Sequence, residues 1–318
     1  MTLNPFARAL DTALDRTVVP GFSKIGYAVR RRLPTWPADP ATGALAGRHI
    51  AVTGATSGLG TATAQQLSDL GAHVHLIVRN TDKAVDVAAG LSGPSTTWKC
   101  DIGDLDSVRE CAATILADGP PLDGIVHNAG AMPPERAESP QGHELSMSIH
   151  VLGPILLTEL LRPALAGRDA RVVLITSGGM YTQKLPVTDP DYTHGEYSGS
   201  TAYARSKRTQ VELLETLETR WAADGIAVYA MHPGWAATPG VSDSLPGFDK
   251  VMGPILRNVD TGADTTTWLM AAQPRPQGGG LWMDRRERPT SYLPKTKPTS
   301  GERRRIWEWT ANALDLTP

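Results

Sequence analysis

The chain has 318 residues and a formal net charge of −2, which argues against a dedicated nucleic-acid-binding protein because such proteins carry a basic surplus. Cys100 and Cys111 are the only cysteines, too few for a disulfide framework and without zinc-site spacing. We therefore expect reduced core thiols in a cytoplasmic protein. We find no apolar run of the roughly 18 residues that a membrane span needs, and we expect no secretory leader.

Residues 1–46 are expected to form an N-terminal helical extension and linker. One short helix is predicted over residues 4–14, with Phe6, Leu10 and Leu14 on one face, and another over residues 22–33, which ends in three arginines. Such a basic end after an amphipathic stretch can make a peripheral contact with an anionic membrane. A packed extension with a solvated basic end is the alternative, and the shortness of both stretches favours it.

From residue 49 onward, strand and helix patterns alternate, which is typical of a parallel sheet covered by helices on both faces. We predict an α/β fold, a Rossmann-type doubly wound sheet in one dinucleotide-binding domain over residues 47–290. The predicted strands are 50–53, 73–78, 96–100, 124–127, 171–176, 226–230 and 281–283, and the helices are 59–70, 81–89, 104–117, 144–165 and 201–223.

Residues 291–318 are expected to form a C-terminal tail that contains a helix. Three arginines beside Trp307 and Trp309 raise the alternatives of a nucleic-acid or membrane contact. A docked terminal helix is favoured, because this is one short cluster in a near-neutral chain.

The turn Thr53-Gly54-Ala55-Thr56-Ser57-Gly58-Leu59-Gly60 directly follows the first strand. Its glycines allow close approach of a ligand, and the first N–H groups of the next helix point back into the turn, so the stretch predicts a phosphate-binding site. Arg79 lies 19 residues beyond Gly60, where an acidic residue would bind the ribose of NAD(H). An arginine there can bind the 2′-phosphate of NADP(H), which we therefore prefer to NAD(H), although a solvated arginine is the alternative.

Tyr203 and Lys207 lie four residues apart, hence on one face of the predicted helix that follows the fifth strand. A tyrosine titrates near pH 10, and a nearby ammonium group would stabilise its phenolate. Ser177, at the end of the fifth strand, is placed to hold a substrate oxygen beside Tyr203. His73 and His75 share a face of the second strand, but no third ligand is evident, so we expect a structural role and no metal site.

These motifs occur in an order that resembles the short-chain dehydrogenase/reductase family. The glycine turn is followed by Asn128-Ala129-Gly130, Ser177, Tyr203-x-x-x-Lys207 and Pro233-Gly234, and the resemblance covers roughly residues 47–290. A narrower likeness, to one branch of this family, rests on the residues around Ser177-Gly178-Gly179-Met180 and Met231-His232-Pro233-Gly234-Trp235.

The resemblance implies a role for each matched position. Tyr203 would be the catalytic general acid/base, Lys207 would lower its pKa and bind the nicotinamide ribose, and Ser177 would polarise the carbonyl. The implied cofactor-binding residues, which also include Tyr203 and Lys207, are Gly54, Ser57, Gly58, Leu59 and Gly60 at the pyrophosphate, Arg79, Asn80, Asp101 and Ile102 at the adenosine, Asn128, Ala129 and Gly130 in the cleft, and Pro233, Gly234 and Thr238 near the carboxamide.

One position departs from the family pattern. The family carries an asparagine three residues before a glycine in the helix after the fourth strand, where it helps to hold a water in the proton relay. Counting back from Gly153 gives His150. The histidine can preserve the relay, add a titrating group, or accompany weak catalysis.

We predict an NADP(H)-dependent oxidoreductase that interconverts a carbonyl and a secondary alcohol. A fairly apolar small-molecule substrate is expected because the long segment 234–258 carries Trp235, Leu245, Phe248, Val251, Met252, Ile255 and Leu256. The segment 177–200 is expected to frame the substrate with it. The alternative is an NADP(H)-binding sensor or partner protein with little turnover. A homo-oligomer is left open.

Overall fold

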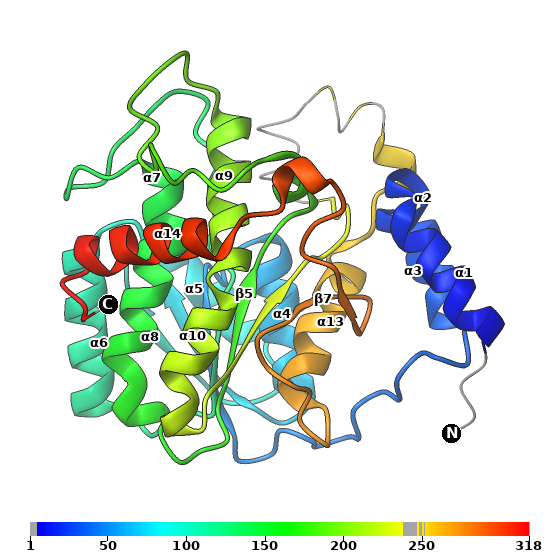
Figure 1. Cartoon of the computed structure of the whole chain (residues 1–318). Helices are drawn as coiled ribbons and strands as arrows, with labels where there is room; N and C mark the ends of the chain where they lie inside the picture. The colour runs from blue at the N-terminus through cyan, green and yellow to red at the C-terminus, as the bar shows by residue number, and fades with distance from the viewer. Residues whose placement is uncertain (1–4, 238–246, 248–249, 251, 318) are drawn as a thin grey trace.

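A computed structural model of the chain describes residues 5–237, 247, 250 and 252–317, and Figure 1 shows them arranged around a central sheet. The described strands pair in the order β3-β2-β1-β4-β5-β6-β7-β8, all in parallel except β7 with β8. Their bounds are β1 His49–Thr53, β2 His73–Val78, β3 Ser95–Lys99, β4 Gly124–His127, β5 Arg171–Ile175, β6 Ala227–Met231, β7 Leu281–Met283 and β8 Arg286–Arg288. The strand order reverses between β1 and β4, and such a switch point is where doubly wound sheets bind ligands.

Helices cover both faces of the sheet, as Figure 1 shows. One face packs against α4 Gly58–Asp69, α5 Thr81–Gly90 and α13 Val259–Ala271, and the other against α6 Leu105–Asp118, α8 Gly153–Leu165, α9 Gly199–Glu212 and α10 Leu214–Trp221. Each face has its own cluster of buried apolar residues, so the central strands are buried on both sides. The predicted α/β doubly wound fold is confirmed.

The predicted strands agree with the observed ones to within one residue at each end. Two elements had no clear sequence signal. The strand β8 consists of Arg-Glu-Arg and shows no apolar alternation, and α13 contains the run Thr265–Thr267, whose β-branched side chains are poor helix formers. Both are stabilised by tertiary contacts, since α13 packs on α4 and β8 pairs with β7.

The helix predicted over residues 144–165 is interrupted. It consists of α7 Leu145–Met147, a π-helical turn over Ser148–Leu152, and α8, which begins at Gly153. The expected bend at Pro154 is therefore preceded by a widened turn that contains His150. The stretch predicted over 201–223 is likewise divided into α9 and α10 at Leu213.

The N-terminal extension forms three short helices, α1 Pro5–Arg16, α2 Val18–Phe22 and α3 Lys24–Arg31, which lie beside the sheet on the side of β7 and α13 (Figure 1). The face of α1 that is buried is not the predicted apolar one with Phe6, Leu10 and Leu14. The side of α1 that is buried carries Ala7, Asp11 and Asp15, whereas Phe6 is 75% exposed. Arginines of α3 and β8 that pair with Asp11 account for this inward acidic face, as described below.

The tail helix α14 Ser300–Ala313 packs on the domain, which confirms the docked terminal helix. Ile306 and Trp307 are buried, and Arg303 forms an ion pair with Glu212 at 2.8 Å. The helical stretch Leu145–Leu165 is apolar and long enough to cross a membrane, but 78% of that window is buried within the fold, as in an ordinary core helix.

Candidate active site

The glycine turn lies at the carboxyl end of β1, where three loops meet. Gly54 has a positive φ of 63°, and an added Cβ would lie 2.7 Å from the Ala129 Cα, so only glycine fits there. The Asn128 side-chain amide donates to the Thr53 and Gly54 carbonyls at 3.2 and 3.1 Å. The Thr53 hydroxyl accepts from the N–H groups of Asn128 and Ala129, both at 3.0 Å. These bonds fix the turn against the loop after β4.

The first turn of α4 starts directly after Ser57, so its free N–H groups face the cavity beyond the strand ends. Gly60 has a packing role in this turn. It does not line the cavity, and an added Cβ would lie 2.2 Å from the Gly54 carbonyl oxygen and 2.5 Å from the Asn128 amide nitrogen. Gly60 therefore permits the close packing of α4 against the turn.

The predicted adenosine end of the site is positively charged and open to solvent. The Arg79 side chain is 81% exposed and lies 3.8 Å from the Asp101 carboxylate, a loose contact that leaves its guanidinium accessible. Asn80 caps α5 by accepting from the N–H groups of Asp82 and Lys83. Lys83, which sequence reasoning missed, lines the same cavity. A basic residue in the first turn of the helix after β2 was the available signal.

Ser177, Tyr203 and Lys207 converge at the other end of the same cavity. Ser177 follows β5 and accepts from the Gly179 N–H at 3.3 Å, which sets its orientation. Tyr203 and Lys207 come from one face of α9, and the Lys207 Nζ lies 5.5 Å from the centre of the Tyr203 ring. The Lys207 ammonium donates to the Ile175 carbonyl at 2.7 Å. The predicted catalytic residues are thus brought together by the ends of β5 and α9.

Burial dominates the electrostatics of these groups. It raises the pKa of Tyr203, and a hydrogen bond with Ser177 opposes that rise. It lowers the pKa of Lys207 to about 7. The Lys207 amine is held by the Ile175 carbonyl in this structure, and burial is the largest influence on the Tyr203 pKa. An additional polar partner near Nζ would favour its charged form.

The His150 side chain connects the loop after β4 to α9 through hydrogen bonds. Its Nε2 accepts from the Ala131 N–H at 3.2 Å, so the ring proton is assigned to Nδ1, which donates to the Ser206 hydroxyl at 2.7 Å. Burial, with a smaller effect of Lys207, holds the pKa of His150 well below its usual value, so the ring stays neutral. Its edge faces the Tyr203 ring at a centroid distance of 5.1 Å. The imidazole is therefore a neutral, hydrogen-bonded structural group and does not titrate near neutral pH.

The backbone carbonyl at this position has a side-chain partner. The Gln210 amide donates to the His150 carbonyl oxygen at 2.6 Å, and its own Oε1 has no hydrogen-bond partner among the described residues. A carbonyl oxygen has two lone pairs, so one remains for a water. The remaining lone pair allows the predicted water of the proton relay to bind this carbonyl. The Gln210 amide, which the sequence did not reveal as a partner, competes with that water as a donor.

A cavity of about 730 Å³ joins the two ends of the site. Sixteen of the predicted site residues line it, namely Gly54, Ser57, Gly58, Leu59, Arg79, Asn80, Asp101, Ile102, Asn128, Ala129, Gly130, Ser177, Tyr203, Lys207, Pro233 and Gly234. Thr238 lies outside the described residues. The glycine turn and the start of α4 fit the pyrophosphate of a dinucleotide.

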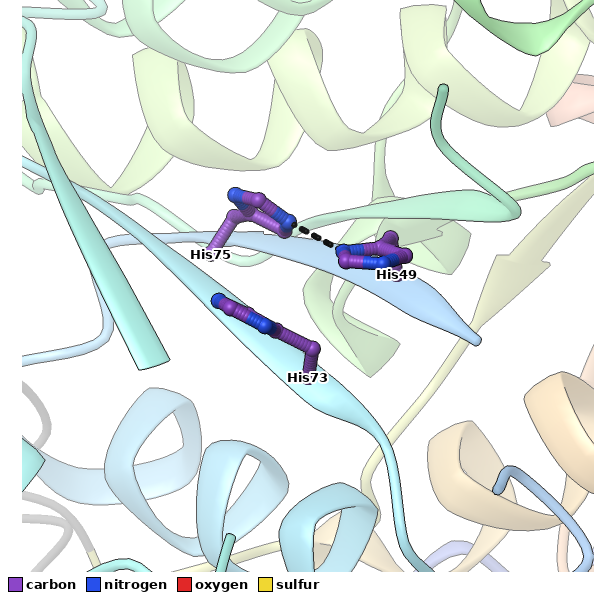
Figure 2. A group of neighbouring side chains, drawn as sticks. All are labelled: His49, His73 and His75. Carbon is purple, nitrogen blue, oxygen red and sulfur yellow. Dashed lines mark hydrogen bonds between the residues drawn. The ribbon is translucent and has the colours of Figure 1, made fainter. Parts of the chain in front are cut away.

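The three histidines His49, His73 and His75 form a separate cluster at the amino ends of β1 and β2, as Figure 2 shows. The structure adds His49 to the pair expected from the sequence, and one ligand atom from each residue lies within 4.8 Å of the others. The rings of His73 and His75 stack with only 17° between their planes. A metal ion lies in the plane of each imidazole that binds it, so stacked rings do not converge on one ion.

Ring nitrogens of this cluster are also occupied by hydrogen bonds. The Trp98 indole N–H donates to His75 Nδ1 at 3.0 Å, so the His75 proton resides on Nε2 and is donated to His49 Nδ1 at 3.0 Å. His73 Nε2 lies 2.9 Å from the Thr96 hydroxyl. The geometry therefore supports the structural role that we predicted for these histidines.

Comparison with known proteins agrees with this site. Residues 48–246 match the family model described as short chain dehydrogenase, which is more than half of the chain. The chain is 36% identical over 265 residues to dehydrogenase/reductase SDR family member 12 from Bos taurus, covering 80% of this chain and 81% of the relative. It is 33% identical over 285 residues to a Streptomyces protein named provisionally as a daunorubicin C-13 ketoreductase, covering 86% and 95% respectively.

A solved structure of an uncharacterised protein from Mycobacterium paratuberculosis is 27% identical with a TM-score of 0.70, covering 87% of this chain and 98% of that one. The fold and the site thus define an oxidoreductase that acts on CH–OH groups with NAD(P) as acceptor. The chain belongs to the short-chain dehydrogenase/reductase family, and its narrower likeness is to member 12 of the dehydrogenase/reductase series.

Proposed function

We propose that this protein is an NADP(H)-dependent enzyme that interconverts a carbonyl and a secondary alcohol on a fairly apolar small molecule. The observation that carries the proposal is that one cavity holds Ser177, Tyr203 and Lys207 at one end and the exposed guanidinium of Arg79 at the other. A dinucleotide that spans these ends would place its nicotinamide beside the phenol.

The protein groups have separable roles in this proposal. When bound, the cofactor supplies a hydride to the carbonyl carbon or accepts one from the alcohol. Tyr203 donates its phenolic proton to the oxygen of the carbonyl, or accepts that proton in the oxidative direction. The Ser177 hydroxyl donates to the same oxygen and holds it beside the phenol. A charged Lys207 stabilises the phenolate that remains on Tyr203.

The substrate end of the cavity supports an apolar carbonyl compound. Met132, Ile149 and Trp235 line it together with the polar catalytic groups. A second cavity of about 710 Å³ shares Thr182 and Gln183 with the first and is lined by three basic side chains, Lys184, Arg205 and Lys295. A substrate panel should therefore contain ketones and aldehydes both with and without a distal carboxylate.

The alternative is an NADP(H)-binding sensor with little turnover. It is favoured by His150 at the usual asparagine position and by the Gln210 amide that already occupies the carbonyl of that residue. Under this alternative the cofactor binds normally, while no carbonyl compound is reduced. The two functions therefore differ in a single measurable property.

Turnover and binding are measured on the same full-length protein. We expect NADPH oxidation with at least one member of a panel of aldehydes, ketones, quinones and sterols, and loss of at least about 100-fold in kcat for Tyr203→Phe with unchanged NADPH affinity. Tyr192→Phe, which removes a hydroxyl bound to the Glu196 carbonyl, is the matched control. Binding of NADPH without any turnover would favour the sensor, and a fully active Tyr203→Phe would remove Tyr203 from the mechanism.

A further inference from the structure

The N-terminal helices α1, α2 and α3 expose apolar side chains to an unusual extent for a folded domain. Seven large hydrophobic side chains are exposed among the described residues, and four of them lie between residues 6 and 25. They are Phe6 at 75%, Val18 at 50%, Val19 at 49% and Ile25 at 48% exposed. A concentration of exposed apolar side chains in so short a segment is typical of an interaction surface.

The acidic groups of the same helices point inward instead. Asp11 and Asp15 of α1 are buried, and Asp11 accepts from the Arg30 Nε at 2.8 Å and from the Arg288 guanidinium at 3.0 Å. Arg286 also pairs with Asp11. The acidic face of the amphipathic helix α1 therefore holds it to the domain. Its remaining surface, which carries Phe6, is directed to solvent.

The exposed charges of this segment are all of one sign. Between residues 5 and 32 both acidic residues are buried, and the exposed charged residues are Arg8, Arg16, Lys24, Arg31 and Arg32. These five cations contrast with the net charge of −2 of the whole chain. A second copy of this surface would be repelled by it, whereas an anionic surface would be attracted.

We propose that the exposed side of α1–α3 is a docking surface for an anionic lipid bilayer. Exposed apolar side chains and exposed cations, both present in this segment, are the two components of interfacial binding, and each basic residue contributes about 1 kcal/mol near an anionic leaflet. In a cytoplasmic protein this leaflet is the inner face of the membrane. The helices lie flat on the bilayer and do not cross it.

The surface is connected to the active site. Phe22, at the end of α2, packs edge-on against His232 at 4.7 Å between ring centres, and its carbonyl accepts from the Trp235 N–H at 2.8 Å. Trp235 lines the catalytic cavity. Docking would therefore hold the substrate end of the cavity near the membrane, which suits a fairly apolar substrate as proposed above. The docking itself does not depend on that function.

The test is co-sedimentation of the full-length protein with vesicles of phosphatidylcholine alone or with half phosphatidylglycerol. We expect binding to the anionic vesicles, weakening at high salt and little binding to phosphatidylcholine. Replacing Arg8, Lys24 and Arg31 by Gln should weaken binding by on the order of 100-fold, which corresponds to three cations. A variant with Val18→Ser, Val19→Ser and Ile25→Ser should also lose most of the binding.

Matched variants elsewhere on the surface serve as controls. Val85→Ser, Leu116→Ser and Leu293→Ser remove three exposed apolar side chains outside the segment, and Lys99→Gln, Lys297→Gln and Arg304→Gln remove three exposed cations. Both should bind vesicles like the wild type, and all variants should retain their NADPH affinity and thermal midpoint. Equal loss in the control variants would overturn the proposal. Absence of vesicle binding would also overturn the proposal. This holds whether or not sedimentation equilibrium shows self-association through Val18, Val19 and Ile25.

Discussion

At the scale of single residues, the site depends on how burial changes ordinary side-chain chemistry. Lys207 is buried beside one carbonyl, so its pKa falls to about 7, and His150 is buried between two hydrogen-bond partners, so its pKa falls well below the usual value. The lysine is poised to change its charge near neutrality, whereas the histidine is not. Uptake or release of a proton by the site near neutral pH is therefore expected to come from Lys207.

The first prediction concerns this linkage. If the cofactor supplies polar partners to the Lys207 ammonium, its pKa rises on binding, and binding takes up a proton above about pH 7. NADPH affinity should then fall as the pH rises from about 7.5 to about 9.5, a range above the titration of the 2′-phosphate. Calorimetry in buffers of different ionisation enthalpy measures the proton uptake. Lys207→Met should abolish it, and a pH-dependent uptake that survives in this variant would contradict the assignment.

Arg79 provides the second prediction, for cofactor preference. Its guanidinium is 81% exposed and only loosely paired with Asp101, so it can bind a 2′-phosphate. A hydrogen bond to a charged group contributes about 1.5–3 kcal/mol, so Arg79→Ala should weaken NADPH by about 10- to 100-fold and NADH much less. Fluorescence titration with both cofactors checks this, and Arg109→Ala, an exposed arginine on α6, is the control. Equal loss for both cofactors would exclude a phosphate contact.

At the scale of secondary structure, the β7–β8 hairpin connects the N-terminal helices to the domain. Its two-residue turn, Asp284 and Arg285, has φ of 53° at both positions, as a tight hairpin requires. The Asp284 carboxylate is buried between Arg30 at 2.6 Å and Arg257 at 2.6 Å. Burial alone would raise the pKa of Asp284, but these two arginines lower it to about 2. One carboxylate thus neutralises cations from α3 and from the segment before α13.

The third prediction tests this buried network. Asp284→Asn keeps a residue that tolerates positive φ but leaves Arg257 without its counter-charge and Arg30 with Asp11 alone, and breaking a buried pair costs about 3–5 kcal/mol. We expect a loss of this size in the free energy of unfolding, measured by urea denaturation. Asp169→Asn is the matched control, because Asp169 also has a positive φ of 54° but forms an exposed ion pair with Arg275.

That control should cost less than about 1 kcal/mol, since exposed ion pairs contribute little. Equal effects of the two substitutions would show that the backbone conformation, and not the buried charge, determines the loss. A loss of under about 1 kcal/mol for Asp284→Asn would show that the arginines find other partners.

At the scale of the whole molecule, several buried histidines make stability depend on pH. Burial lowers the pKa of His75 to about 4, with smaller effects of His73 and His49, and burial lowers the pKa of His127 and His232 to about 3. An unfolded histidine titrates near pH 6.5, so below that value the unfolded state binds more protons than the folded state. Stability is therefore complete above about pH 6.5 and is lost progressively on acidification.

The fourth prediction follows from His75. Between about pH 7 and about pH 5 its depressed pKa should cost the folded state about 2 kcal/mol, in addition to the effects of the other histidines. Urea unfolding at both pH values measures the loss. His75→Gln should show a smaller loss over the same interval, and His194→Gln, at an exposed position, should behave like the wild type. An unchanged pH dependence in His75→Gln would contradict the role of the cluster.

The sequence determined the doubly wound sheet, the strand positions and the ordered motifs, because alternating apolar strands and amphipathic helices are local patterns and the glycine turn and Tyr203-x-x-x-Lys207 are local spacings. Only the tertiary structure decided which distant groups meet. It placed His49 beside His75, Gln210 on the His150 carbonyl, and Lys83 beside the predicted adenosine end. It also turned the acidic face of α1 inward, since the arginines that bind Asp11 come from α3 and β8, far along the chain.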